Sequence, residues 1–126
     1  MKMKSLRKAG NKMDSAVKPP KVYQLRASLF GIDPPIWRRL LMRGDATLSN
    51  LGWAIERAMG WTGWHAHAMD VGKKRYGVPE GSCGVLDEQD FCIQDVLRRR
   101  GSRLKYYYDY GDYWIHIVEV EAILPM

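Results

Sequence analysis

The sequence predicts an α+β domain, with a mixed or antiparallel sheet of about five strands, one main helix packed on one face and a short second helix. Segments with apolar residues at every second position stand on both sides of one segment with helical apolar spacing. The length of 126 residues and the 46% hydrophobic composition indicate a single globular domain.

Residues 22–42 predict a β-hairpin. Apolar and polar side chains alternate over residues 22–30, as in a strand with one buried face. Residues 31–35 contain a glycine and two prolines and predict the turn, because proline fixes φ and cannot donate to a sheet. Residues 36–42 then form the returning strand.

Residues 47–59 predict the main helix. Thr47 can cap its first turn, the apolar residues follow helical spacing, and Gly60 suits a left-handed end. Residues 93–97 predict the short second helix. The arginines of residues 98–100 follow it, and cations are favourable at a helix C-terminus without any phosphate partner.

Three further segments predict strands, 65–71, 104–109 and 113–124, and residues 74–76 predict a short continuation of the first of these or a hairpin arm. The segment 77–90 contains several glycines and a proline, and it predicts a loop.

The net charge of +6 lies in the first 21 residues, which hold seven basic residues and one acidic residue. We therefore expect a basic, disordered N-terminal tail over 1–21 and one domain over 22–126, in which acidic and basic residues are equal in number. Basic arms can bind phosphate backbones without sequence preference. The residues of the tail that would do so are Lys2, Lys4, Arg7, Lys8 and Lys12.

No apolar run is long enough to span a bilayer or to form a signal peptide. The spacing of Cys83 and Cys92 matches no common zinc or redox motif, so we expect two free thiols and a cytoplasmic protein without a membrane partner.

All three histidines lie in two short aromatic motifs, residues 61–67 and 109–116. If the two segments are neighbours in the fold, they form one polar and aromatic patch, which is the predicted functional site. Its residues are Trp61, Trp64, His65, His67, Asp109, Asp112, Trp114 and His116.

His65 and His67 would share one face of a strand, about 6.6 Å apart along it. With His116 as a third ligand they predict a site for a divalent metal, with zinc or manganese as the fitting ions. Asp112 cannot join His116 on one ion, because four residues of extended strand separate them by about 13 Å. The alternative is that the histidines are half-buried sheet residues that hydrogen-bond to aspartates or tyrosines.

The same motifs resemble the plasmid pRiA4b ORF-3-like family, whose members are also described as passenger proteins of insertion elements. The resemblance rests on Gly31-Ile32-Asp33-Pro34-Pro35-Ile36-Trp37-Arg38-Arg39, on Gly60-Trp61-x-x-x-His65-x-His67 and on Asp109-Tyr110-Gly111-Asp112-x-Trp114-x-His116. It covers residues 22–124 and implies an α+β domain in a prokaryotic mobile-element context, without an established reaction. Many members continue beyond the last strand, whereas this sequence ends at Pro125-Met126.

Three hypotheses of function follow. The first is a non-enzymatic binding module that uses the patch to contact a protein partner or a second copy of the chain. The second is a metal-dependent, hydrolase-like enzyme with His65, His67 and His116 as ligands. The third is a nucleic-acid accessory protein that uses the tail and the basic cluster of Arg98 to Arg103.

Overall fold

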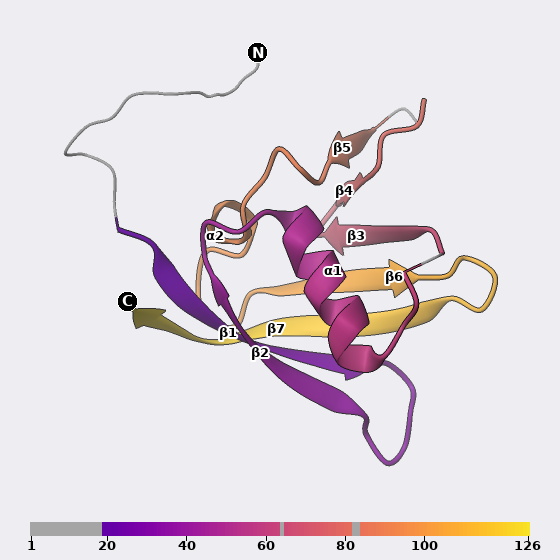
Figure 1. The fold of residues 1–126 in the computed structure, drawn as a ribbon, viewed down its shortest axis with the longest axis horizontal. Helices are drawn as coiled ribbons and strands as arrows, with labels where there is room; N and C mark the ends of the chain where they lie inside the picture. Colours follow the sequence, from indigo (N-terminus) through magenta and orange to yellow (C-terminus); the bar gives the residue numbers. More distant parts are fainter. Residues whose placement is uncertain (1–18, 64, 82–83) are drawn as a thin grey trace.

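The computed structural model describes residues 19–63, 65–81 and 84–126, which form one seven-stranded sheet with a helix across one face (Figure 1). The strands are β1 (Lys21–Leu29), β2 (Trp37–Arg43), β3 (His67–Val71), β4 (Lys74–Gly77), β5 (Val85–Asp87), β6 (Arg103–Tyr108) and β7 (Trp114–Pro125). They are ordered β2-β1-β7-β6-β3-β4-β5. Neighbours are antiparallel except β4 and β5, which are parallel.

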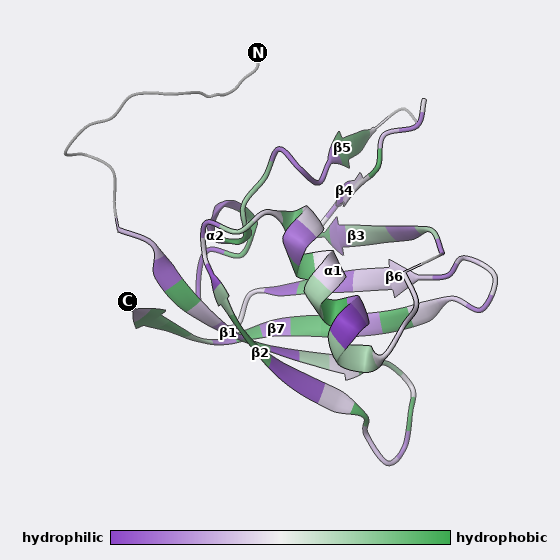
Figure 2. Cartoon of the chain, in the orientation of Figure 1, coloured by the Kyte–Doolittle hydropathy of each residue, from purple (hydrophilic) through white to green (hydrophobic). Residues whose placement is uncertain are grey.

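The predicted hairpin is present, and β7 pairs with its first strand. Leu25 lies opposite Leu40 on β2 and opposite Val120 on β7. Apolar and polar residues alternate along these strands (Figure 2), so that one face of the sheet supplies the core and the other carries mostly polar side chains.

The main helix, α1 (Leu48–Met59), lies over the apolar face of the sheet (Figure 1). The Thr47 side chain accepts a hydrogen bond from the Asn50 N–H at 3.1 Å, and Gly60 ends the helix with a φ of 85°. Leu51 and Ile55 are fully buried against the strands. Both predicted ends of the helix are therefore confirmed.

The second helix, α2 (Ile93–Val96), is one short turn. Backbone hydrogen bonds connect it and the residues before it to the start of α1. The Ile93 N–H donates to the Ala46 carbonyl at 2.9 Å, and the Leu48 N–H donates to the Phe91 carbonyl at 2.9 Å. Cys92 precedes α2 as a free thiol, whereas Cys83 lies outside the described residues. Neither helix in the described ranges has the length and apolarity needed to cross a bilayer.

The predicted α+β class with about five strands is wrong: the sheet has seven strands, and the chain is only 15% helical and largely β. The short strand β5 lies inside the segment 77–90, which we expected to be a loop. Its pairing with β4 joins residues about ten positions apart, such as Arg75 with Val85. Local periodicity within one segment does not report which other segment it pairs with, so the pattern could not reveal this strand.

The predicted domain of residues 22–126 has its first strand beginning at Lys21. The predicted disordered tail falls mainly on residues 1–18, which lie outside the described residues.

Candidate functional site

The two aromatic motifs lie side by side, and hydrogen bonds and stacked rings connect them. The Asp109 N–H donates to the Ala66 carbonyl at 2.8 Å, and the Gly63 N–H donates to the Tyr108 hydroxyl at 2.9 Å. The Trp61 ring stacks on Trp114, with centroids 5.4 Å apart. These contacts hold the segment between α1 and β3 against the β6–β7 turn.

His116 is buried inside this junction and uses both ring nitrogens within the protein. The Trp61 indole N–H donates to Nε2 of His116 at 3.0 Å, so the proton of a neutral ring is on Nδ1, which donates to the Tyr106 carbonyl at 3.0 Å. Burial lowers the pKa of His116, which keeps the imidazole neutral. His116 therefore stabilises the packing of the two motifs.

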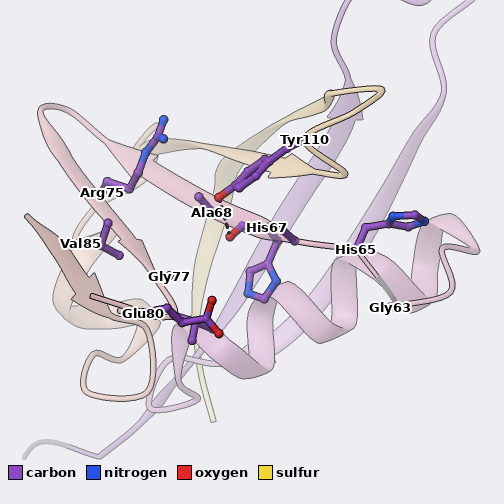
Figure 3. Close-up of a pocket in the computed structure, with 11 residues that line it drawn as sticks. Gly63, His65, His67, Ala68, Arg75, Gly77, Glu80, Val85 and Tyr110 are labelled. Carbon is purple, nitrogen blue, oxygen red and sulfur yellow. Dashed lines mark hydrogen bonds between the residues drawn. The ribbon is translucent and has the colours of Figure 1, made fainter. Parts of the chain in front are cut away.

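His65 and His67 do not share a strand face. The third strand begins at His67 rather than at His65, so the period-two argument that aligned the two rings does not apply. Figure 3 shows the His65 ring directed away from the His67 ring. The side chain of His65 is half exposed, and its Nδ1 lies 3.7 Å from Asp109 Oδ1.

Two of the three histidines predicted as metal ligands, His67 and His116, contact the ring of Tyr106. The Tyr106 ring centroid lies 5.8 Å from that of His67 and 5.6 Å from that of His116. Within the described ranges, no three histidine, cysteine, aspartate or glutamate side chains are placed to hold a metal ion. The geometry adds no support to a zinc or manganese site.

The remaining patch residues have other positions. Asp109 stabilises the β6–β7 turn, because its Oδ1 accepts from the Gly111 N–H at 3.0 Å and lies 3.4 Å from the Asp112 N. Asp109 and Tyr113 have φ values of 64° and 61°, a conformation that costs energy in a non-glycine residue. Trp64 lies outside the described residues.

Two buried carboxylates beside His67 were missed by the sequence analysis. Glu88 Oε1 lies 2.8 Å from Nε2 of His67, and Glu56 Oε2 accepts a short hydrogen bond from the Tyr106 hydroxyl. Glu56 and Glu88 are only 7% and 5% exposed. A signal for Glu56 was present, because it lies eight residues after Leu48, on the apolar stripe of α1, where a charge is unusual.

These contacts shift the pKa values of the groups between the two carboxylates. The hydrogen bond to Glu88 raises the pKa of His67, and the charges of Glu88 and Glu56 act in the same direction against burial. Burial, followed by the hydrogen bond to Glu56, raises the pKa of Tyr106, so its hydroxyl remains protonated. Strongly perturbed groups beside a cavity are typical of functional sites.

A cavity of about 610 Å³ opens beside His67 (Figure 3). The pairing of β3 with β4 ends at Met69 and Tyr76. The cavity opens next to this end of the pairing, where His67 and Val78 are no longer paired with each other. The lining residues come from the segment before β3, from β3 and β4, from the β4–β5 connection, from β5 and from the β6–β7 turn: Gly63, His65, Ala66, His67, Ala68, Arg75, Gly77, Val78, Glu80, Val85 and Tyr110.

Polar groups of the cavity are held in place by neighbours. Arg75 makes two hydrogen bonds to Asp70, at 2.7 and 2.9 Å. The Tyr110 hydroxyl donates to the His67 carbonyl at 3.1 Å, so its ring lies along the wall (Figure 3). The cavity therefore presents polar side chains in fixed orientations beside the apolar side chains of Val78 and Val85.

The basic residues proposed for nucleic-acid binding are only partly described. Lys2, Lys4, Arg7, Lys8 and Lys12 lie outside the described residues. The second basic cluster runs from Arg98 to Arg103. Arg98 donates to the Asp95 carbonyl at 3.1 Å, and Nη2 of Arg103 lies 3.3 Å from Oε1 of Glu119. These contacts give both arginines partners within the domain.

Comparisons with known proteins agree on one family. The family model described as plasmid pRiA4b ORF-3-like protein matches residues 21–126. The uncharacterised protein y4hQ of Sinorhizobium fredii is 29% identical over 107 residues, which cover 82% of this chain and 55% of that protein. The crystal structure of MM3350, a protein of unknown function from Methanosarcina mazei Go1, has a TM-score of 0.76 and 31% identity over 85% of this chain and 63% of that one. The chain thus spans little more than half the length of these relatives.

Proposed function

Since this chain belongs to the plasmid pRiA4b ORF-3-like family, whose relatives named above are uncharacterised, we propose its function from its own site: it is a binding module that takes a ligand in the cavity beside His67. The observation that carries the proposal is the cavity of about 610 Å³, a volume within the range of small-ligand sites. Its polar groups come from several separate segments of the chain, so a ligand there would contact most of the β3–β5 region.

The preorganised side chains support a binding role. Glu88 orients His67, Asp70 orients Arg75, and the Tyr110 hydroxyl is bound to the backbone. Side chains that are ordered before binding lose little further conformational entropy when a ligand arrives. A metal-dependent hydrolase remains the alternative, and the metal content of protein purified without chelators tests it.

The test is a screen of acidic, neutral and basic fragments by ¹H–¹⁵N NMR. We expect at least one fragment to shift the amide signals of Gly63, His67, Gly77 and Tyr110 together, because these residues line one cavity. Val78 lines the cavity and is 54% exposed, so Val78→Trp should fill the space without disturbing the core and weaken that binding about tenfold or more.

Leu41→Trp is the matched control, since Leu41 is 65% exposed on β2, away from the cavity. If no fragment of any charge shifts the four amides, or if Val78→Trp binds as well as the wild type, the proposal is wrong.

A further inference from the structure

The strand β2 forms one edge of the sheet and is seven residues long (Figure 1). It pairs only with β1, so the other side of its backbone has no neighbouring strand in the described part of the chain. The opposite edge of the sheet, β5, has three residues. A long edge strand is a template for pairing with another chain, and β2 is the longer of the two edges.

The register with β1 identifies which backbone groups of β2 point outward. The Gly44 N–H donates to the Lys21 carbonyl at 2.7 Å, and the Leu29 N–H donates to the Ile36 carbonyl at 2.9 Å. Residues of an antiparallel strand bond alternately to the neighbour on one side and to the space on the other. Every second residue from Ile36 to Gly44 therefore bonds to β1. The residues that point outward are Trp37, Arg39, Leu41 and Arg43.

The outward backbone groups at the centre of β2 are open. At the two ends of the row, the Trp37 carbonyl accepts from Nη1 of Arg38 at 2.8 Å, and the Arg43 carbonyl accepts from a backbone N–H at 3.1 Å. The N–H and carbonyl groups of Arg39 and Leu41 have no protein partner among the residues that the structure describes. A strand placed beside β2 would bond to both of these residues.

The edge also carries an excess of positive charge. The strand holds three arginines and no acidic residue. Arg39 and Arg43 each pair with one carboxylate. Arg38 donates to two backbone carbonyls, and Arg26 of β1 lies over the Trp37 ring, 4.2 Å from its centroid. Neither Arg26 nor Arg38 forms an ion pair within the described ranges, so both charges are available to an acidic partner.

The two faces of β2 differ in character. Leu40 and Met42 are partly buried and pack against the core on the α1 side of the sheet. Arg39 and Arg43 lie on the opposite face, with the 65% exposed Leu41 between them. Residues directly opposite each other on neighbouring strands share a face. A strand with alternating apolar and acidic side chains therefore fits both faces of this edge.

We propose that β2 takes an acidic, extended segment of a partner protein as an additional strand of the sheet. The segment bonds to the backbone of Arg39 and Leu41, its apolar side chains pack beside Leu40 and Met42, and its carboxylates face the arginines. A second copy of β2 fits less well, because it brings three further arginines to the same edge and like charges side by side are destabilising. This surface is separate from the cavity, which lies among β3, β4 and β5.

The test titrates the full chain with three blocked peptides of equal length, which alternate glutamate with valine, lysine with valine, and glutamate with proline. The third keeps the charge of the first but cannot form a strand, because proline has no N–H. We expect the glutamate–valine peptide to shift the Arg39 and Leu41 amide signals in NMR spectra and to slow their hydrogen exchange. It should bind at least about tenfold more tightly than the other two peptides.

Variants locate the binding on β2. Leu41→Pro removes an outward N–H, which proline tolerates on an edge strand, and it should weaken binding about tenfold or more. Leu41→Thr keeps that N–H and should bind within a few-fold of the wild type. Arg26→Gln removes an unpaired charge and should weaken binding by a few-fold. Lys73→Gln removes one charge from an exposed turn between β3 and β4, away from β2, and should leave binding unchanged.

The outcomes separate the possible occupants of the edge. The proposal is wrong if either of the other peptides binds as tightly as the glutamate–valine peptide, or if no peptide binds. It is also wrong if Leu41→Pro and Arg26→Gln both bind as well as Lys73→Gln does. Should Leu41→Pro fail to fold, Arg26→Gln and the three peptides decide.

Self-association is measured by analytical ultracentrifugation without peptide. A dimer that Arg39→Glu strengthens or Leu41→Pro dissociates would make a second copy the occupant and overturn the proposal. In each of these cases the proposed function of the cavity stands, because its test uses other residues.

Discussion

At the scale of single residues, the histidines of the two motifs have different roles. His116 is buried and neutral between Trp61 and the Tyr106 carbonyl, whereas His67 faces a buried carboxylate and lines a cavity. His65 is half exposed. The three histidines were predicted as one set of metal ligands. Their surroundings instead make His116 part of the packing, place His67 at the cavity and leave His65 at the surface.

The pairing of His67 with Glu88 predicts a pH dependence of stability. Since the pKa of His67 is raised in the folded chain, its ion pair stabilises the fold fully below the unfolded pKa of about 6.5, and this contribution is lost as the pH rises through the folded pKa. Glu88→Gln should lower the pKa of His67, because burial would then outweigh the remaining charges.

The measurement is an NMR titration of the His67 ring, combined with urea unfolding of wild type and variant from pH 5 to pH 9. We expect the difference in unfolding free energy between the two to shrink as the pH rises. A constant difference over this range would contradict the pairing, and Glu119→Gln controls for the loss of one surface charge.

At the scale of elements, the approach of α1 to the sheet depends on a glycine. A Cβ atom on Gly52 would lie 3.1 Å from the ends of the Met69 and Tyr106 side chains. The helix therefore comes close enough for Glu56, one turn later, to accept the Tyr106 hydroxyl. The position of the buried carboxylate follows from this close packing.

We expect Gly52→Ala to destabilise the protein by up to about 2 kcal/mol. Alanine favours helix by about 1 kcal/mol, but overpacking against two fully buried side chains costs about 1–3 kcal/mol. Urea unfolding measures the change. Ser49→Ala, on the partly exposed side of the same helix, is the control and should change stability by no more than about 0.5 kcal/mol. A stabilised Gly52→Ala protein would show that α1 is not closely packed at this position.

At the scale of the whole molecule, the sheet is covered on one face and charged on the other. Ion pairs such as Arg39 with Glu121 and Arg103 with Glu119, at 2.7 and 3.3 Å, lie on the face opposite α1. This pairing agrees with the equal numbers of acidic and basic residues after residue 21. Any net attraction for nucleic acid should therefore come from the N-terminal residues.

Replacing Lys2, Lys4, Arg7, Lys8 and Lys12 with glutamine in the full chain should abolish retention on heparin at moderate salt. The slope of log affinity against log salt for DNA should fall by about 0.9 for each phosphate contact that is lost. The paired variant Arg98→Gln with Arg100→Gln should have a much smaller effect. Unchanged retention after the five substitutions would place the basic surface on the folded domain instead.

The sequence by itself determined the features that depend on local patterns. Alternation and two prolines predicted the hairpin, and helical spacing with Thr47 and Gly60 predicted both ends of α1. The motifs of residues 61–67 and 109–116 also indicated the family whose model matches residues 21–126.

Only the tertiary structure decided which groups meet beside His67. Glu56 and Glu88 reach His67 from a helix and from a loop, 11 positions before it and 21 after it, and neither lies in an aromatic motif. The seventh strand and the largely β class depended in the same way on pairing between β4 and β5. Such contacts form when segments that are distant in the sequence pack together, and the periodicity within one segment does not predict them.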